Sequence, residues 1–275
     1  MRVSKAVPQP RSDWLVPFAS RRSVLAGIAS ALGLAVSQRA DMALSIGSES
    51  KMEETKKVLS VVCVGAHPDD PEESSFGTLA RYAEAGHRVT VIYLTRGERG
   101  IAGKSLEEAA AIRTAEAEVA CRIISAKAVF AGQVDGDTEV NRKRIGEFSE
   151  LLSAQKPDVV ITHWPIDTHP DHQAASFLTQ RAYLDSRRPF RLYFFEVESG
   201  HQSLGFVPQV YVDITATRAQ KQAALFSHKS QHGEEIYHKH HELIERFRGR
   251  EIGTEAAEAF IPMARDTKNG LPGLA

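Results

Sequence analysis

Apolar residues in the chain alternate between short, β-branched runs and longer stretches with helical spacing. The short runs predict strands at 58–64, 88–95, 128–130, 159–162, 192–197 and 210–214. Helical spacing and end signals predict helices at 76–86, 106–124, 141–154, 172–184, 217–228 and 234–248. The run at 58–64 is almost entirely apolar, which is typical of a strand buried on both faces. Because strands alternate with helices, we expect an α/β fold, with a Rossmann-like, mostly parallel sheet flanked by helices.

Imidazole and carboxylate side chains follow two of the predicted strands. The sequence His-Pro-Asp-Asp occupies 67–70, after the first strand, and His-Pro-Asp-His occupies 169–172, after the strand at 159–162. In open α/β sheets, ligands bind outside the carboxyl ends of the strands. Neutral imidazole and carboxylate together suit a divalent metal such as zinc, and three protein ligands with an open position would make that metal a hydrolytic catalyst. The motifs therefore predict a metal site at the carboxyl ends of the strands.

Each motif also has a purely structural interpretation. The first motif alone fits an aspartate that caps a helix beside a hydrogen-bonded histidine. In the second, His169 and His172 are three residues apart and can lie on one side of a helix start, so that one binds the metal while the other faces a substrate. Two such motifs in one chain favour the metal site. The turn at 65–70 contains neither G-x-G-x-x-G nor G-K-[ST], which argues against nucleotide binding.

Composition limits the remaining classes of function. The chain has 275 residues, of which 42% are hydrophobic and 25% charged, with a net charge of −1. This is an ordinary globular composition, and no basic excess points to a nucleic-acid partner. Without its N-terminal region the chain keeps roughly 230 residues, enough for one large domain. The only cysteines, Cys63 and Cys121, fit packing positions, although an exported protein could pair them.

The N-terminal region predicts export. Arg21 and Arg22 precede an apolar run at 24–36, which resembles a twin-arginine signal. The run has about 13 residues, fewer than the roughly 20 needed to span a bilayer. We therefore expect an exported protein, periplasmic or extracellular, with no stable membrane anchor after cleavage; the alternative is a short amphipathic or disordered leader. The expected organisation is a signal peptide at 1–37, a linker at 38–56, a domain at 57–265 and a tail at 266–275.

The motifs resemble the signature of the PIG-L (LmbE-like) de-N-acetylases. The resemblance spans about residues 57–262 and rests on blocks at 66–72, 77–79, 94–98, 135–136, 169–172, 212–215, 228–231 and 258–260. The blocks at 66–72 and 169–172 are the most specific. The sequence Glu-Ser-Ser-Phe at 73–76 departs from the family, which usually has an apolar residue and a glycine-rich turn there. The departure leaves the shape of the pocket beside the metal open and removes no metal ligand.

The resemblance implies a role for each residue of the two main motifs. Zinc, or another divalent metal such as Fe²⁺, would be held by three ligands, His67, Asp70 and His172. Asp69 would act as the general base. His169 would polarise the acetyl carbonyl and stabilise the oxyanion, and Asp171 would orient an imidazole, that of His169. The implied reaction removes the acetyl group from an N-acetylglucosamine conjugate and releases acetate and a free amine.

Substrate contacts are less specified by the sequence. In the family the region after the second strand faces the substrate, so Arg96 and Glu98 are candidates for substrate binding, with a surface ion pair as the alternative. His228 is a further candidate, although a histidine at a helix C-terminus is also favoured by the helix dipole. The histidines at 232, 238, 240 and 241 predict a solvated helix face. Family members often assemble, so the resemblance also implies a homo-oligomer.

Two other functions fit the same residues. The site could act on another small N-acyl or ester substrate, or the fold could serve as a non-catalytic module that binds a sugar or a metal. The presence of both Asp69 and His169 argues against the second alternative, because metal binding alone requires neither.

Overall fold

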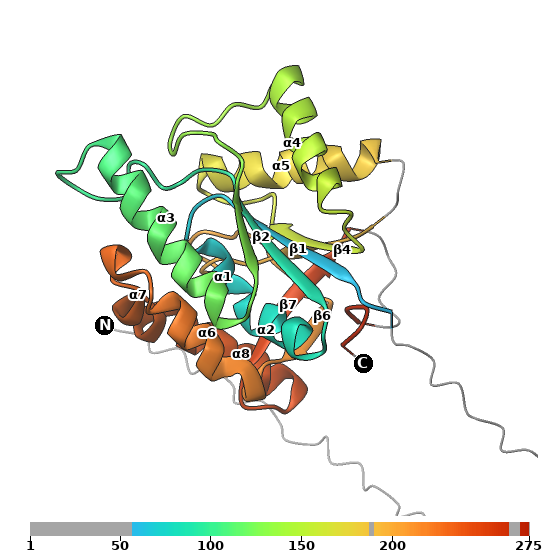
Figure 1. Ribbon diagram of the computed structural model, residues 1–275. Coiled ribbons are helices and arrows are strands. Elements are labelled where there is room, and N and C mark those ends of the chain that lie inside the picture. The colour runs from blue at the N-terminus through green and yellow to red at the C-terminus, as the bar shows by residue number, and fades with distance from the viewer. Residues whose placement is uncertain (1–56, 187–189, 264–269, 275) are drawn as a thin grey trace, which may run out of the picture. The chain divides into compact units, whose positions relative to one another are not determined.

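A seven-stranded sheet forms the centre of the computed structural model, which describes residues 57–186, 190–263 and 270–274 (Figure 1). The strand order is β3-β2-β1-β4-β5-β7-β6. Strands β1 to β5 pair in parallel, whereas β7 is antiparallel to both β5 and β6. The expected α/β fold with a mostly parallel sheet is therefore confirmed. The expected signal peptide at 1–37 and linker at 38–56 lie outside the described residues.

The strands match the predicted runs, with one addition. Their bounds are β1 (Ser60–Gly65), β2 (Arg88–Tyr93), β3 (Lys127–Phe130), β4 (Val159–His163), β5 (Arg191–Phe195), β6 (Val210–Asp213) and β7 (Ala257–Pro262). The sequence did not predict β7, because a glutamate interrupts its apolar pattern. That residue, Glu258, is buried, accepts the N–H groups of Gly77 and Thr78 at 3.0 and 2.7 Å, and pairs with Lys221 at 2.8 Å. These partners compensate the cost of burying the carboxylate.

The helices also follow the predicted order. Their bounds are α1 (Asp70–Ser74), α2 (Phe76–Glu84), α3 (Leu106–Ile123), α4 (Arg142–Ala154), α5 (Pro170–Asp185), α6 (Arg218–Leu225), α7 (Gly233–Ile236) and α8 (Glu242–Ile252). Short 3₁₀ turns η1 (Thr215–Thr217) and η2 (Lys229–Gln231) and a π-helical turn η3 (Tyr237–His241) complete the list. Helix α3 begins at a capping box, in which Ser105 Oγ accepts the Glu108 N–H at 3.2 Å. The sequence missed α1, which has only five residues.

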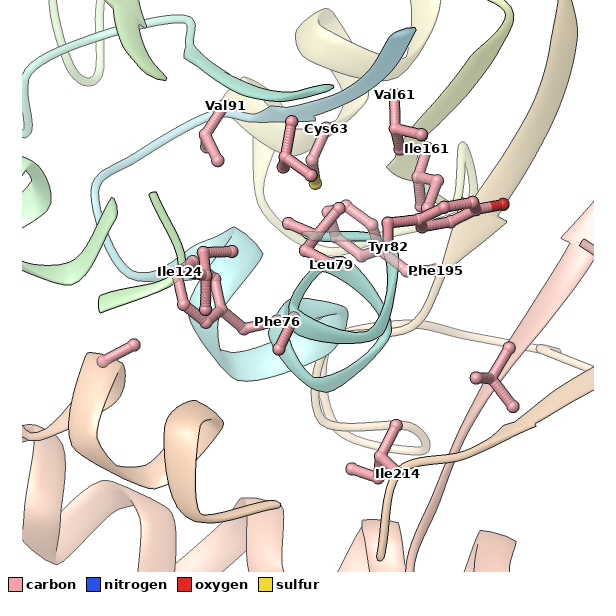
Figure 2. Packing of buried hydrophobic residues seen from close by; sticks show 14 of the residues in the cluster. Val61, Cys63, Phe76, Leu79, Tyr82, Val91, Ile124, Ile161, Phe195 and Ile214 are labelled. Carbon is pink, nitrogen blue, oxygen red and sulfur yellow. The ribbon is translucent and has the colours of Figure 1, made fainter. Parts of the chain in front are cut away.

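Each face of the sheet carries its own apolar core. Successive residues of β1 point to opposite faces, so Val61 and Cys63 join one cluster while Val62 and Val64 join the other. Helices α2, α3 and α6 cover the first face, and α4 and α5 cover the second (Figure 1). Figure 2 shows the first cluster, with side chains of α2 packed beneath those of the central strands. Both faces of β1 are therefore buried, as its apolar run predicted.

Two further features bear on the sequence predictions. Both cysteine thiols, Cys63 and Cys121, are free and buried. Residues 270–274, within the expected C-terminal tail, pack on the domain: Tyr193 donates a hydrogen bond to the Gly270 carbonyl at 3.1 Å, and Leu271 is buried. Among the described residues, no helix has the length and apolar character needed to cross a membrane.

Candidate active site

The two His-Pro-Asp motifs meet at one edge of the sheet. Strands β1 and β4 are parallel neighbours, so their carboxyl ends lie side by side. Helix α1 begins at Asp70, a few residues after β1, and α5 begins at Pro170, a few residues after β4. Each motif therefore forms the turn between a strand and a helix. The ligand atoms of His67, Asp70 and His172 lie within 4.8 Å of one another, and all three residues are buried.

The spacing within this triad fits a small divalent metal. Asp70 Oδ2 lies 3.3 Å from His67 Nδ1, and Asp70 Oδ1 lies 3.2 Å from His172 Nε2. Zinc ligands at their usual bond lengths in a tetrahedron are about 3.3 Å apart. The donor set of two imidazoles and one carboxylate is also one that zinc uses in catalytic sites. Two overlapping groups of residues could also hold a metal: one joins His67 and Asp171 to His169, and the other joins His172 to His163 and Asp167.

The outer nitrogens of the two ligand imidazoles favour the first triad. His67 Nε2 lies 3.1 Å from Asp171 Oδ2, and His172 Nδ1 lies 3.1 Å from Asp167 Oδ1. Metal-binding histidines usually donate their second N–H to a carboxylate, which fixes the ring and its tautomer. Asp171 contacts both imidazoles: its carboxylate contacts His67, and its backbone N–H is accepted by the His169 ring. Nothing in the sequence spacing distinguishes the two rings, because the choice depends on how α5 turns its first residues.

Charge complementarity holds the triad together. Burial lowers the pKa of His172, but the Asp70 and Asp167 carboxylates outweigh it and bring the pKa to about 9. Burial opposes ionisation of Asp70, yet the surrounding imidazoles of His172, His163 and His67 keep its pKa well below the usual range. The carboxylate is thus anionic among its imidazole partners. A metal cation would replace protons at this position.

Asp69 lies beside the triad in a strained backbone conformation. Its φ is 119°, a region that residues other than glycine rarely adopt, and such strain is common at active sites. Its N–H is donated to Glu72 Oε2 at 3.2 Å, and its Oδ2 accepts from Arg113 Nη2 at 2.7 Å. Burial raises the pKa of Asp69, Arg113 lowers it, and the resulting value is about 7. A carboxylate with a pKa near 7 can accept and release a proton close to neutral pH.

Two glycines make room for the arginine that holds Asp69. Arg113 comes from α3, and its Nη2 also donates to the Pro68 carbonyl at 2.5 Å. A Cβ added to Gly97 or Gly100 would overlap the guanidinium of Arg113. Gly97 belongs to the block at 94–98 that carries part of the family resemblance, and Gly100 follows it in the loop after β2. Their absent side chains thus allow Arg113 to reach the first motif.

His169 is the N-cap of α5 and lines the cleft. Its Nδ1 accepts the Asp171 N–H at 3.2 Å, so in the neutral ring the proton is on Nε2. Burial, together with the nearby His67 and His172, lowers the pKa of His169 and keeps the ring neutral. His169 can therefore donate a hydrogen bond to a substrate oxygen.

The triad opens into a cleft of about 380 Å³. The residues that line it come from both motifs, from the loops after β2, β3 and β5, and from α1, α3, η2 and α7: His67, Asp69, Asp70, Glu73, Arg99, Gly100, Arg113, Asp135, His169, His172, Glu198, Gln202, Gln231 and Ile236. This volume suits a small molecule with a few polar groups. Most lining side chains are polar, as a sugar site requires.

The expected substrate-binding residues do not line this cleft. Arg96 points to solvent and contacts Glu98 at 3.4 Å, while Glu98 is buried and accepts the Asp135 N–H at 3.1 Å. His228 is fully buried, 3.4 Å from Glu72 Oε1, behind the first motif. The cleft instead contains Arg99, whose Nε donates to the Asp135 carbonyl at 2.6 Å. Three residues beyond Arg96, the chain has turned back toward the metal site, which periodicity could not indicate.

Sequence reasoning also missed the supporting residues. Asp167 accepts the His169 N–H at 2.9 Å in addition to its contact with His172. His163 closes β4, and its Nε2 accepts the Ala66 N–H at 3.0 Å. A signal did exist, because both residues lie between β4 and the second motif and have the same chemistry as its members. Their roles, like those of the predicted ligands, follow from three-dimensional contacts.

The fold and this site define a class. A mostly parallel α/β sheet with a buried His/Asp group at its carboxyl edge is typical of a metal-dependent hydrolase. Residues 62–183 match the PIG-L family, described as GlcNAc-PI de-N-acetylase. This segment therefore resembles a PIG-L family domain, and the protein is an enzyme, a hydrolase that acts on C–N bonds.

Several known proteins are similar to this chain. The diacetylchitobiose deacetylase of Thermococcus kodakarensis is 28% identical over 225 residues, 74% of this chain and 84% of that protein. The 1D-myo-inositol 2-acetamido-2-deoxy-alpha-D-glucopyranoside deacetylase of Actinosynnema mirum is 28% identical over 163 residues, 48% of this chain and 58% of that protein. The 4-oxalmesaconate hydratase of Pseudomonas putida is 26% identical over 185 residues, 60% of this chain and 71% of that protein.

The solved structures agree with the fold. The N,N'-diacetylchitobiose deacetylase of Pyrococcus horikoshii, in complex with its inhibitor, has a TM-score of 0.66 and 25% identity, and the match covers 74% of this chain and 83% of that one. The conserved protein TT1542 of Thermus thermophilus has a TM-score of 0.66 and 29% identity, over 75% of this chain and 95% of that one.

Proposed function

We propose that the protein is a zinc-dependent de-N-acetylase that removes the acetyl group from an N-acetylglucosamine conjugate, giving a free amine and acetate. One observation carries this proposal. The buried group of His67, Asp70 and His172 opens directly into a cleft that also exposes Asp69 and His169. A metal site, a proton acceptor and a hydrogen-bond donor are the parts that amide hydrolysis needs. Deacetylases among the relatives support the same reaction.

The residues divide the chemistry among them. A divalent metal held by the triad would polarise the amide carbonyl and lower the pKa of water. Asp69, fixed by Arg113, accepts a proton from the attacking water. The new C–O bond forms as negative charge develops on the carbonyl oxygen, where neutral His169 donates a hydrogen bond. Protonated Asp69 then gives its proton to the departing nitrogen, the C–N bond breaks, and acetate and amine are released.

The hydratase relative raises a second candidate reaction, the addition of water to a carbon–carbon double bond. Its named substrate is an organic acid anion. Among the described residues, the cleft of this chain is lined by five carboxylates and by only two guanidiniums, those of Arg99 and Arg113. This excess of carboxylates would repel such an anion. The charge of the cleft therefore favours a sugar amide over a carboxylic acid.

The test measures metal and product together. The purified protein is stripped with a chelator, reloaded with zinc or Fe²⁺, and incubated with N-acetylglucosamine conjugates while acetate and free amine are quantified. We expect equal amounts of both products, released only by loaded protein. The Asp69→Asn variant should keep its metal and lose most turnover. Loaded protein that releases no acetate from any such conjugate, or an Asp69→Asn variant with normal turnover, would contradict the proposal.

We also propose that the protein is exported and acts on a small amino-sugar conjugate, without a nucleic-acid partner. Arg21 and Arg22 ahead of a short apolar run support export. The cleft volume and the net charge of −1 support a small-molecule partner. A homo-oligomer is a further proposal, which light scattering of the purified protein tests directly.

A further inference from the structure

The π-helical turn η3 places two histidines against the cleft wall. His241 is 4% exposed, and its Nε2 lies 3.3 Å from Glu73 Oε2 without an aligned hydrogen bond. His240 Nδ1 lies 3.6 Å from Glu198 Oε1. The expected solvated helix face was therefore wrong for His241. Turns of π-helix occur frequently at functional sites. The carboxylates that face the two histidines are those of Glu73 and Glu198.

Both carboxylates belong to the cleft and lie near its reacting end. Glu73 is one helical turn beyond Asp69, and the Glu73 N–H donates to the Asp69 carbonyl at 2.9 Å. The side chains of Glu73 and Glu198 are 10% and 17% exposed, so they form the wall of the cleft. Glu73 stands in the segment where this chain departs from the family pattern, at 73–76. Glu73 thus belongs to the segment of the cleft that departs from the family pattern.

Among the described residues, no lysine or arginine forms an ion pair with Glu73 or Glu198. Asp69, by contrast, pairs with a guanidinium, that of Arg113. Within the part of the chain that the structure describes, the ion-pair partners of the two carboxylates are imidazoles, those of the two η3 histidines and, for Glu198, also His201 at 3.0 Å. An imidazole, unlike a guanidinium, carries no permanent charge. The wall therefore offers negative charge to whatever enters the cleft.

The neighbouring lining residues fit a sugar. Gln202 lines the same side of the cleft and has an amide that can both donate and accept hydrogen bonds. Ile236, the residue before η3, is the only aliphatic side chain among the described residues that line the cleft, and it gives the apolar face of a sugar ring a packing surface. The wall thus combines negative charge, an amide and one apolar contact.

We propose that Glu73 and Glu198 form a carboxylate subsite that determines specificity, by binding a positively charged amino group on the part of the conjugate next to the reacting N-acetyl group. The inference rests on the proposed de-N-acetylase function. An ammonium group can donate a charge-assisted hydrogen bond to each carboxylate. A phosphate or carboxylate at the same place is repelled. The preferred substrates are therefore conjugates that already carry a free amine, such as partly deacetylated amino-sugar oligomers.

The experiment compares glycosides that differ only in charge. The zinc-loaded protein is assayed with the 2-aminoethyl, 2-hydroxyethyl and carboxymethyl glycosides of N-acetylglucosamine, and kcat/KM is measured by acetate release. We expect the aminoethyl glycoside to exceed the carboxymethyl glycoside by about tenfold or more, the factor of a charged hydrogen bond. Glu73→Gln and Glu198→Gln should each reduce this ratio, whereas Glu150→Gln, an exposed carboxylate on α4, should not.

The ratio between two substrates within one variant cancels any general loss of activity, and thermal unfolding shows whether each variant is folded. Equal kcat/KM for the three glycosides, or a cationic preference that persists in both cleft variants, overturns the subsite. A calorimetric measurement of how tightly the same glycosides bind needs no turnover. It therefore tests the carboxylate subsite separately from the de-N-acetylase activity. If no glycoside releases acetate but the wild type still binds the aminoethyl glycoside more tightly than Glu73→Gln does, the proposed function fails and the subsite stands.

Discussion

Replacing Arg113 with methionine should leave the proposed general base, Asp69, without the contact that positions it beside the metal site. Methionine keeps much of the volume and removes the guanidinium, whose Nη2 binds Asp69 Oδ2 at 2.7 Å and the Pro68 carbonyl at 2.5 Å. The side chains of Arg113 and Asp69 are 4% and 14% exposed, so both contacts are largely shielded from water. We expect unfolding to become easier by about 2–3 kcal/mol, the range for lost hydrogen bonds to a charged, mostly buried group.

The effect on rate should be larger than the effect on stability. A shift of about 1 Å in a catalytic group lowers the rate by roughly a hundredfold. Arg113 contacts none of the triad residues, so the zinc content should stay at the wild-type level. The assay combines acetate release, zinc analysis and thermal unfolding on one preparation. A folded, zinc-loaded Arg113→Met protein with wild-type kcat/KM would refute the idea that Arg113 positions Asp69.

Two glycine variants give a matched check of the same reasoning. Gly100→Ala adds a Cβ that overlaps the Arg113 guanidinium, so it should lower the rate without removing the metal. Gly146→Ala, in α4, adds a Cβ with nothing within 4 Å, so it should leave the rate unchanged and stabilise the helix by about 0.5–1 kcal/mol. Equal rates in the two variants would contradict the crowding around Arg113.

Three further predictions address the metal and the N-terminal region. Asp167→Asn should weaken zinc binding by about tenfold to a hundredfold, because it disturbs the partner of His172 Nδ1, and a competition titration with a chelator measures the change. The pKa of His172 is raised to about 9, so protons compete with the metal below that pH; zinc affinity should fall as the pH falls, and an affinity independent of pH between about 6.5 and 8.5 would contradict this. Arg21→Lys combined with Arg22→Lys should leave the precursor inside the cell, which fractionation and N-terminal sequencing detect; export unaffected by both changes would rule out a twin-arginine signal.

Much of the fold was readable because burial and local pattern agreed. The apolar run of β1 is buried on both faces, and its carboxyl end carries the first motif. Strand β7 was missed because Glu258 breaks its pattern, and only the distant Lys221 and the N-terminal end of α2 make that carboxylate acceptable in the core. An apolar run that a charged residue interrupts can be recognised as a buried strand only once the partners of that charge are known.

The sequence predicted the two motifs of the site but not the contacts that their side chains make. Motif spacing placed imidazoles and carboxylates at strand ends, where the structure brings them together. Which carboxylate contacts which ring depends on side-chain direction: the carboxylate of Asp171 contacts His67, and only its backbone N–H contacts the His169 ring. Arg96 and His228 were assigned to the cleft on their place in the chain, although the loop after β2 and the end of α6 turn them away from it. Loop conformation is therefore the information that the sequence pattern lacked.

The central claim is that one histidine of the second motif binds metal while the other acts on the substrate. Zinc content and acetate release should be measured on the same preparations of wild type, His172→Ala and His169→Ala. The account predicts that His172→Ala loses most of its zinc, whereas His169→Ala keeps its zinc and loses about a hundredfold or more in rate. An empty site in His169→Ala together with a full site in His172→Ala would contradict the account.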